Sequence, residues 1–170
     1  CTDDGIAESC MAVAGGCGAW QREECQEGFS CFEGQCREEP ASWCGQPFIA
    51  QLGEQQGTTS GMGLYQGRCR NRDAAENVYR FVAPEAGVFS FRTSAAAFVP
   101  VLYARRVCDD GTEAAQLACA VGSRAVAPEL RIRLNADQEI YVFVDGRGPP
   151  HMGDYTLNIA KFADLPALGE

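Results

Sequence analysis

The alternation of apolar and polar side chains is clearest over residues 77–91, NVYRFVAPEAGVFSF. Tyr79 and Phe81 fall on one face of a first strand, and Phe89 and Phe91 fall on one face of a second. The PEAG segment between them supplies a turn, because proline fixes φ and glycine tolerates a positive φ. The pattern therefore predicts a β-hairpin whose aromatic rings share one sheet face and form a core that the rest of the chain covers.

Similar patterns predict further short strands along the chain. Residues 140–144 are nearly continuously apolar, which suits a central strand, and Pro100 places its strand at a sheet edge or at a bulge. We expect the strands at 130–134, 140–144 and 155–159 to oppose the hairpin and cover its rings. Seven or more short strands without an amphipathic helix indicate an all-β fold, an antiparallel β-sandwich. The predicted strands are 48–52, 57–65, 77–83, 88–92, 96–105, 130–134, 140–144 and 155–159.

Ten cysteines in 170 residues indicate an exported protein in an oxidising compartment, extracellular or at the cell surface. Their even number fits five disulfides, whereas a lipidated Cys1 would leave an odd one, so a disulfide at Cys1 is favoured over a lipid anchor. Because the chain begins at Cys1, we expect an export segment upstream. No apolar run approaches the roughly 18 residues of a membrane span. The cysteines are Cys1, Cys10, Cys17, Cys25, Cys31, Cys36, Cys44, Cys69, Cys108 and Cys119.

The charge and the cysteines divide the chain near Pro40. Residues 1–40 carry nine acids against two arginines and six of the ten cysteines, and the remainder has a net charge of only −2. A segment this short cannot build a sufficient core, so disulfides must hold it, and the sequence leaves their pairing open. We therefore expect an acidic disulfide-rich module at 1–40 and a β-sandwich domain at 41–170.

The sequence offers little for catalysis, metals or nucleic acid. The net charge of −9 disfavours non-specific nucleic-acid binding. The single histidine, His151, lies in a predicted loop without a GxSxG or HExxH motif, and no CxxC pair suggests zinc. The acidic turns at 3–5, 109–111 and 145–146 lack the spacing of a calcium loop and fit turn chemistry. We expect no enzyme activity, no metal and no cofactor.

Three arginines flank a cysteine in the loop before the predicted hairpin: Arg68, Arg70 and Arg72. A disulfide at Cys69 would hold them in place, so they form a candidate docking patch for the acidic module of a neighbouring copy or for an anionic polysaccharide. The alternative is a solvated rim that keeps the sandwich soluble. The pairs 105–106 and 131/133 are expected to add positive surface.

The order of elements resembles that of the bacterial pre-peptidase C-terminal family over roughly residues 44–162. The resemblance lies in NVYRFVAPEAGVFSFRT, AFVPVLYARRVC, QLACA, LNADQEIYVFVDG and GDYTLNI, taken in that order. It implies a jelly-roll-like β-sandwich, with Cys44 paired to Cys69 and Cys108 paired to Cys119. The segment CQEGFSCFEGQC at 25–36 resembles small cysteine-rich modules of secreted myxobacterial proteins and, loosely, EGF-like modules.

Together these features favour a non-catalytic structural or assembly protein of the cell exterior: a subunit of a fibre, pilus or surface complex, with itself or other subunits as partners. A secreted carbohydrate- or matrix-binding module is the alternative, and it would need an exposed Trp or Tyr on one sheet face. Because the tyrosines are expected to alternate mostly inward, the sequence disfavours glycan stacking. A third reading is an accessory segment of a secreted enzyme.

Overall fold

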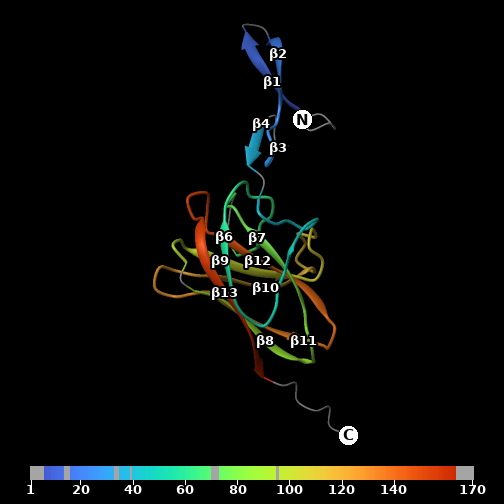
Figure 1. Ribbon diagram of the computed structural model, residues 1–170, viewed down its shortest axis with the longest axis vertical. Helices are drawn as coiled ribbons and strands as arrows, with labels where there is room; N and C mark the ends of the chain where they lie inside the picture. Colours follow the sequence, from blue (N-terminus) through green and yellow to red (C-terminus); the bar gives the residue numbers. More distant parts are fainter. Residues whose placement is uncertain are drawn as a thin grey trace. The chain divides into compact units, whose positions relative to one another are not determined.

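The computed structural model describes residues 6–13, 16–32, 35–38, 40–69, 73–94 and 96–163. The chain divides into two compact units, Cys1–Glu39 and Pro40–Glu170 (Figure 1). Within the described ranges, every regular element is a β-strand.

The first unit contains two antiparallel strand pairs, β1 with β2 and β3 with β4. A disulfide joins Cys25 to Cys36, and Cys31 is also disulfide-bonded. Gly28 has a φ of 83° in the turn that leads into the second pair, a conformation that favours glycine. Cys1 and the side chains of Cys10 and Cys17 lie outside the described residues. The strands are β1 (Ile6–Val13), β2 (Gly16–Glu24), β3 (Phe29–Phe32) and β4 (Gln35–Glu38).

The second unit is a jelly-roll-like sandwich of two sheets, which confirms the predicted fold class. Its strands are β5 (Phe48–Ile49), β6 (Gly53–Thr59), β7 (Asn77–Val82), β8 (Gly87–Ser94), β9 (Pro100–Arg105), β10 (Gln116–Val121), β11 (Glu129–Leu134), β12 (Glu139–Gly146) and β13 (Gly153–Ala163). The five-stranded sheet has the order β10-β9-β12-β7-β5, and the four-stranded sheet has the order β11-β8-β13-β6. All neighbours are antiparallel except β5 and β7.

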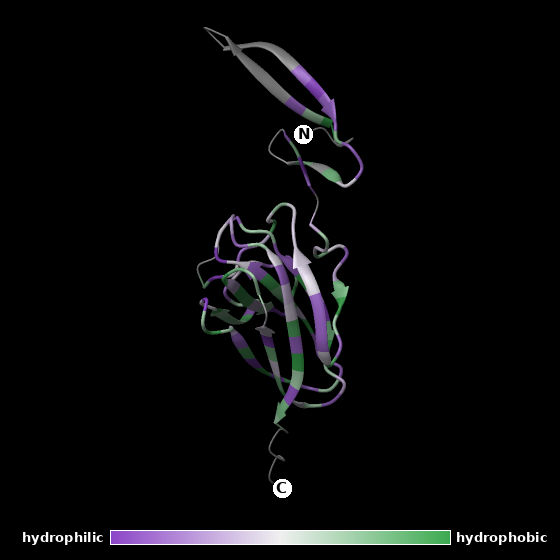
Figure 2. Ribbon diagram, turned by 60° about the vertical axis from the view of Figure 1, so that its left-hand side comes forward, coloured by the Kyte–Doolittle hydropathy of each residue, from purple (hydrophilic) through white to green (hydrophobic). Residues whose placement is uncertain are grey.

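The main core lies between the two sheets and follows the alternation in the sequence (Figure 2). On β11, for example, each apolar residue is buried and each charged residue is exposed. The rings of Phe89 and Phe91 contact the ring of Phe81 edge to face, with centroids 5.4 and 5.2 Å away. At the other end of the core, the hydroxyls of Tyr79 and Tyr155 share a hydrogen bond of 2.7 Å. Burial of these rings supplies the hydrophobic free energy that holds the sheets together.

The predicted hairpin at 77–91 is wrong, although its two strands and its turn are present. The strands β7 and β8 do not pair: β7 lies in the five-stranded sheet and β8 in the four-stranded sheet. The PEAG turn therefore carries the chain across the core, and Phe81 faces Phe89 and Phe91 instead of lying beside them. An alternating pattern fits both arrangements equally, because each strand buries one face in either case.

The strand at 140–144 is also placed differently from our expectation. It belongs to β12, which lies between β9 and β7 at the centre of the five-stranded sheet. The central position is confirmed, but β12 is a neighbour of β7 and does not oppose it. Pro100 occupies neither an edge nor a bulge: it is the first residue of β9, an inner strand, where its missing N–H is tolerated.

Phe81 provides a direct test of the core. Replacing Phe81 by Ala should lower the free energy of unfolding by about 3–5 kcal/mol, because it removes a ring that is 1% exposed. Urea unfolding followed by circular dichroism measures the loss. The adjacent Val82, 39% exposed on the other face, is the matched control, and Val82→Ala should change stability by less than about 1 kcal/mol. Equal losses in the free energy of unfolding for the two substitutions would contradict the assignment of Phe81 to the core face and Val82 to the outer face.

Candidate functional site

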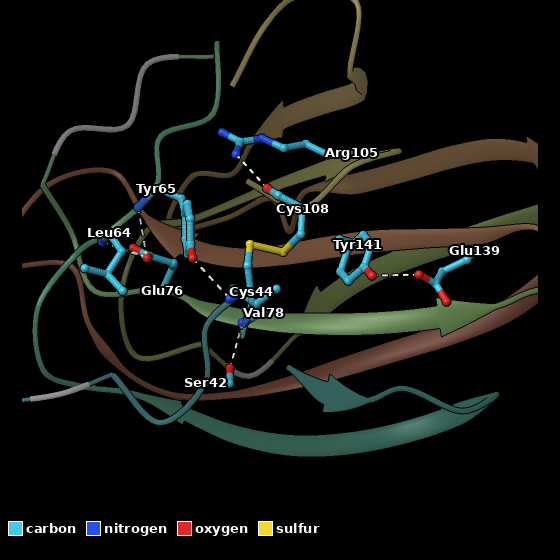
Figure 3. The surroundings of a disulfide bond; sticks show 10 residues. All are labelled: Ser42, Cys44, Leu64, Tyr65, Glu76, Val78, Arg105, Cys108, Glu139 and Tyr141. Carbon is cyan, nitrogen blue, oxygen red and sulfur yellow. Dashed lines mark hydrogen bonds between the residues drawn. A yellow bond between two sulfur atoms is a disulfide. The ribbon is translucent and has the colours of Figure 1, made fainter. Parts of the chain in front are cut away.

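The outer face of the five-stranded sheet is covered in part by loops, and two disulfides hold this cover in place. Figure 3 shows one of them, Cys44–Cys108. Cys44 pairs with Cys108 and Cys69 pairs with Cys119, with Cα–Cα distances of 5.6 and 5.7 Å. The pairing implied by the family resemblance, Cys44 with Cys69 and Cys108 with Cys119, is therefore wrong. Cys44 and Cys69 lie in two different covering loops, Cys108 follows β9 and Cys119 lies in β10, so each disulfide joins segments that are far apart in the sequence.

Beneath this cover lies a second, smaller core that sequence reasoning missed. Its centre is the stacked pair of Tyr103 and Phe143, whose ring centroids are 4.5 Å apart with an interplanar angle of 8°. Tyr65, from the covering loop, packs edge-on against Phe143 at 5.5 Å. Gly67 approaches the Tyr103 ring so closely that a Cβ atom there would lie 2.5 Å from Cδ1, so only glycine fits. Outward-pointing residues of the sheet are thus buried by loops instead of facing solvent.

Arg105 is part of this second core, so the prediction that it adds positive surface is wrong. Its side chain is 3% exposed, and its guanidinium carbon lies 4.9 Å from the Phe143 ring centroid and 5.3 Å from that of Tyr103. The guanidinium donates hydrogen bonds to the carbonyl oxygens of Cys108 at 3.0 Å and Gln66 at 2.8 Å. Arg105 therefore ties two covering loops to the aromatic pair by cation–π contacts and hydrogen bonds.

Glu76 anchors the same cover from the other side (Figure 3). Its Oε1 accepts hydrogen bonds from the backbone N–H groups of Leu64 at 2.8 Å and Tyr65 at 3.1 Å. None of the described residues donates to Oε2, although the carboxyl group is completely buried. Burial raises the pKa of Glu76 to about 7, while the two N–H donors and the nearby charge of Arg105 lower it.

A shallow groove of about 490 Å³ lies beside the Cys44–Cys108 disulfide. Tyr141, half-buried on the outer face of β12, forms one wall, and its hydroxyl donates to Oε1 of Glu139 at 2.6 Å. Arg80 donates from Nε to the other carboxylate oxygen at 2.6 Å. The hydrogen bond from Tyr141, followed by that from Arg80, lowers the pKa of Glu139, so the carboxylate is charged at neutral pH. The groove thus presents an aromatic side chain, Tyr141, and the carboxylate of Glu139, which is paired with the neighbouring Arg80.

Contrary to the prediction from the sequence, the tyrosines do not mostly point into the main core. Tyr79 and Tyr155 point into the main core, but Tyr103 and Tyr141 lie on the outer face of the five-stranded sheet and Tyr65 lies in a loop. The prediction of mostly inward tyrosines is therefore wrong. The cause is that β9 and β12 are apolar on both faces, so alternation alone could not assign their inner side.

The predicted docking patch is described only at Arg68, because Arg70 and Arg72 lie outside the described residues. The Arg68 side chain is exposed and lies 3.5 Å from a carboxylate oxygen of Glu113, and its backbone N–H donates to the side chain of Gln116. A different group of arginines, which we call the arginine face, lies on the outer side of the four-stranded sheet. It consists of Arg92, Arg131, Arg133 and the neighbouring ring of Phe162.

The remaining candidates that the structure describes have structural roles, and the turn predicted at 3–5 lies outside the described residues. His151 accepts a hydrogen bond at Nδ1 from the N–H of Val99 at 3.3 Å, and Asp110 accepts from the N–H of Thr112 in a turn. Asp145 lies inside β12 and is buried, so it belongs to a strand and not to a turn. In the part of the chain that the structure describes, no group of three or more His, Cys, Asp and Glu side chains could hold a metal ion, and no helix is long and apolar enough to cross a membrane.

Comparison with known proteins shows a similarity of fold. The chain matches no family model and no curated protein. It is similar in fold to the crystal structure of the pre-peptidase C-terminal domain of a collagenase from Bacillus anthracis, with a TM-score of 0.45 and 14% sequence identity. The match covers 67% of this chain and 94% of that domain. A likeness this remote carries no argument about what the present chain does.

The buried carboxyl group of Glu76 makes stability depend on pH. Its pKa is about 7 in the folded state and about 4.5 when exposed, so the folded state binds the proton more tightly. The stabilisation this gives is complete below about pH 4.5 and is lost as the pH rises through 7. As the pH falls from 8 to 5, the free energy of unfolding of the wild type should therefore rise by up to about 3 kcal/mol relative to that of Glu76→Gln.

Urea unfolding of both proteins at a series of pH values measures this difference. Glu113→Gln, which removes a carboxylate whose side chain is 86% exposed, is the matched control and should track the wild type at every pH. A constant difference between wild type and Glu76→Gln would show that Glu76 stays ionised in the folded protein.

Proposed function

We propose that this chain is a non-catalytic building block of an extracellular or cell-surface assembly, such as a fibre, a pilus or a surface complex. The observation that carries the proposal is the division of charge between its two units. The described part of Cys1–Glu39 exposes Glu23, Glu24, Glu27 and Glu38 to solvent, whereas the four-stranded sheet of the second unit carries the arginine face. Surfaces of opposite charge on one chain can join copies head to tail, in a contact that need not close on itself.

The covalent structure supports this proposal. Three disulfides are described: Cys44–Cys108 joins two loops over a separation of 64 residues, and Cys69–Cys119 joins a loop to β10 over a separation of 50. Closing loops of this length stabilises the folded state by about 4 kcal/mol per disulfide. Disulfides persist in oxidising compartments and suit a subunit that is exposed outside the cell.

The groove beside Tyr141 favours a second candidate, a secreted binding module for carbohydrate or matrix. A half-buried tyrosine next to a fixed carboxylate–guanidinium pair offers one stacking surface and several hydrogen-bonding groups to a polar ligand. The groove is shallow, and in its described lining Tyr141 is the one aromatic side chain. This arrangement supports weaker recognition than a row of exposed rings would, so the assembly proposal comes first.

Native size under non-reducing conditions separates the two candidates. The assembly proposal predicts that the purified full chain forms oligomers whose size grows with protein concentration, seen by sedimentation velocity, and regular polymers, seen by negative-stain electron microscopy. The same sample in 500 mM NaCl should be smaller, because salt screens exposed charges with a Debye length of only a few ångströms at that strength. A strict monomer at every concentration would remove the assembly proposal and leave the binding module.

A further inference from the structure

The arginine face is formed by the pairing of strands that are far apart in the sequence. Residues of β8 and β11 that point away from the core alternate with buried ones, so Arg92, Arg131 and Arg133 all emerge on the outer side of the four-stranded sheet. The register places Arg131 opposite Ser90 and Arg133 opposite Val88. Both arginine side chains are exposed to solvent, where a partner can reach them.

Arg131 is held in place before any partner arrives. Its guanidinium carbon lies 3.9 Å from the centroid of the Phe162 ring, and its Nε donates to Glu129 at 2.9 Å. Ser90 holds the same carboxylate with a hydrogen bond of 2.9 Å. A guanidinium fixed in this way loses little side-chain entropy on binding a carboxylate, so it is a favourable docking group.

The arginine face also has an unbalanced charge and an exposed ring. Three arginines face one carboxylate, Glu129, across β8 and β11, so this half of the sheet has a positive excess. Phe162, at the end of β13, is 53% exposed. An exposed aromatic ring next to arginines is the composition found at the centres of protein interfaces.

The first unit exposes the complementary set of residues. Phe29, at the start of β3, is 42% exposed and lies opposite Glu38 of β4 in the register. Glu27 precedes it in the same turn and is also exposed, as are Glu23 and Glu24 at the end of β2. In its described part, the first unit thus offers an exposed ring, Phe29, next to the carboxylates of Glu27 and Glu38, as the arginine face offers an exposed ring next to guanidinium groups.

From these two sets we propose that the arginine face receives the acidic unit Cys1–Glu39 of a second copy of this chain. Carboxylates around Phe29 pair with Arg92, Arg131 and Arg133, and Phe29 packs near Phe162. The contact joins different surfaces on the two copies, so each copy keeps one free surface of each kind and the contact can repeat. The five-stranded sheet is a poorer receptor, because stapled loops cover part of its outer face. This interface rests on the proposed function and specifies its geometry.

The test reverses the charge of the arginine face in the full chain. The double variant Arg131→Glu/Arg133→Glu should weaken self-association at least about tenfold, measured by sedimentation velocity in 50 mM NaCl. The matched control is Arg106→Glu/Arg147→Glu, which makes the same charge change at exposed arginines that follow β9 and β12. The control should associate as the wild type does. The control should keep the wild-type melting temperature. The double variant should melt slightly lower, because Arg131 loses its exposed contacts with Glu129 and Phe162, and association is measured well below both melting temperatures.

A charge swap makes the test specific. The variant Glu27→Arg/Glu38→Arg should also fail to associate alone, but it should form complexes when mixed with Arg131→Glu/Arg133→Glu, because the reversed surfaces again attract each other. A different result is that the wild type assembles while the variants neither lose self-association alone nor regain it when mixed. That result would overturn this interface and leave the proposed function standing.

Three other outcomes also contradict the interface. A wild type that stays monomeric removes the proposed function and this inference together. If the sedimentation coefficient of the wild type changes with salt but not with protein concentration, the acidic unit binds the arginine face of its own chain. A monomer that binds heparin through Arg131 and Arg133 would make the arginine face a polyanion site.

Discussion

The two disulfides over the five-stranded sheet are the constraint on which the remaining features of the second unit depend. Cys44–Cys108 and Cys69–Cys119 interleave along the chain, so together they fix three loop segments to one sheet face. These loops bury Tyr103, Phe143 and Arg105, which would otherwise form a large exposed aromatic patch. The same cover leaves the opposite sheet as the broad polar surface of the unit, which is where the arginine face lies.

Much of the fold could be predicted from the sequence, because period-two alternation reports directly on burial. The positions of β7, β8, β11, β12 and β13 agree with the predicted strands. Sheet membership could not be predicted. Phe81 and Phe89 follow the same pattern whether their strands pair or face each other, and only long-range contacts decide between these arrangements.

The candidate site was harder to predict for a related reason. Arg131 and Arg133 alternate visibly with buried residues, but nothing local shows that Arg92 and Phe162 join them on one face, because that depends on strand register. Arg105 shows the opposite case. It is a charged residue next to a loop and was expected to be exposed, yet loops that are distant in the sequence bury it against two rings. Cysteine pairing is equally non-local, and the partners that the family resemblance implied are wrong.

The measurement that tests this account most directly is disulfide mapping of the native protein. Proteolysis without reduction, followed by mass spectrometry, should recover peptides joined through Cys44–Cys108 and through Cys69–Cys119. These links require the loop around Cys44 to reach the segment after β9, and the loop around Cys69 to reach β10, as in the structure. Recovery of Cys44–Cys69 and Cys108–Cys119 instead would contradict the stapled cover, and with it the assignment of the four-stranded sheet as the free surface.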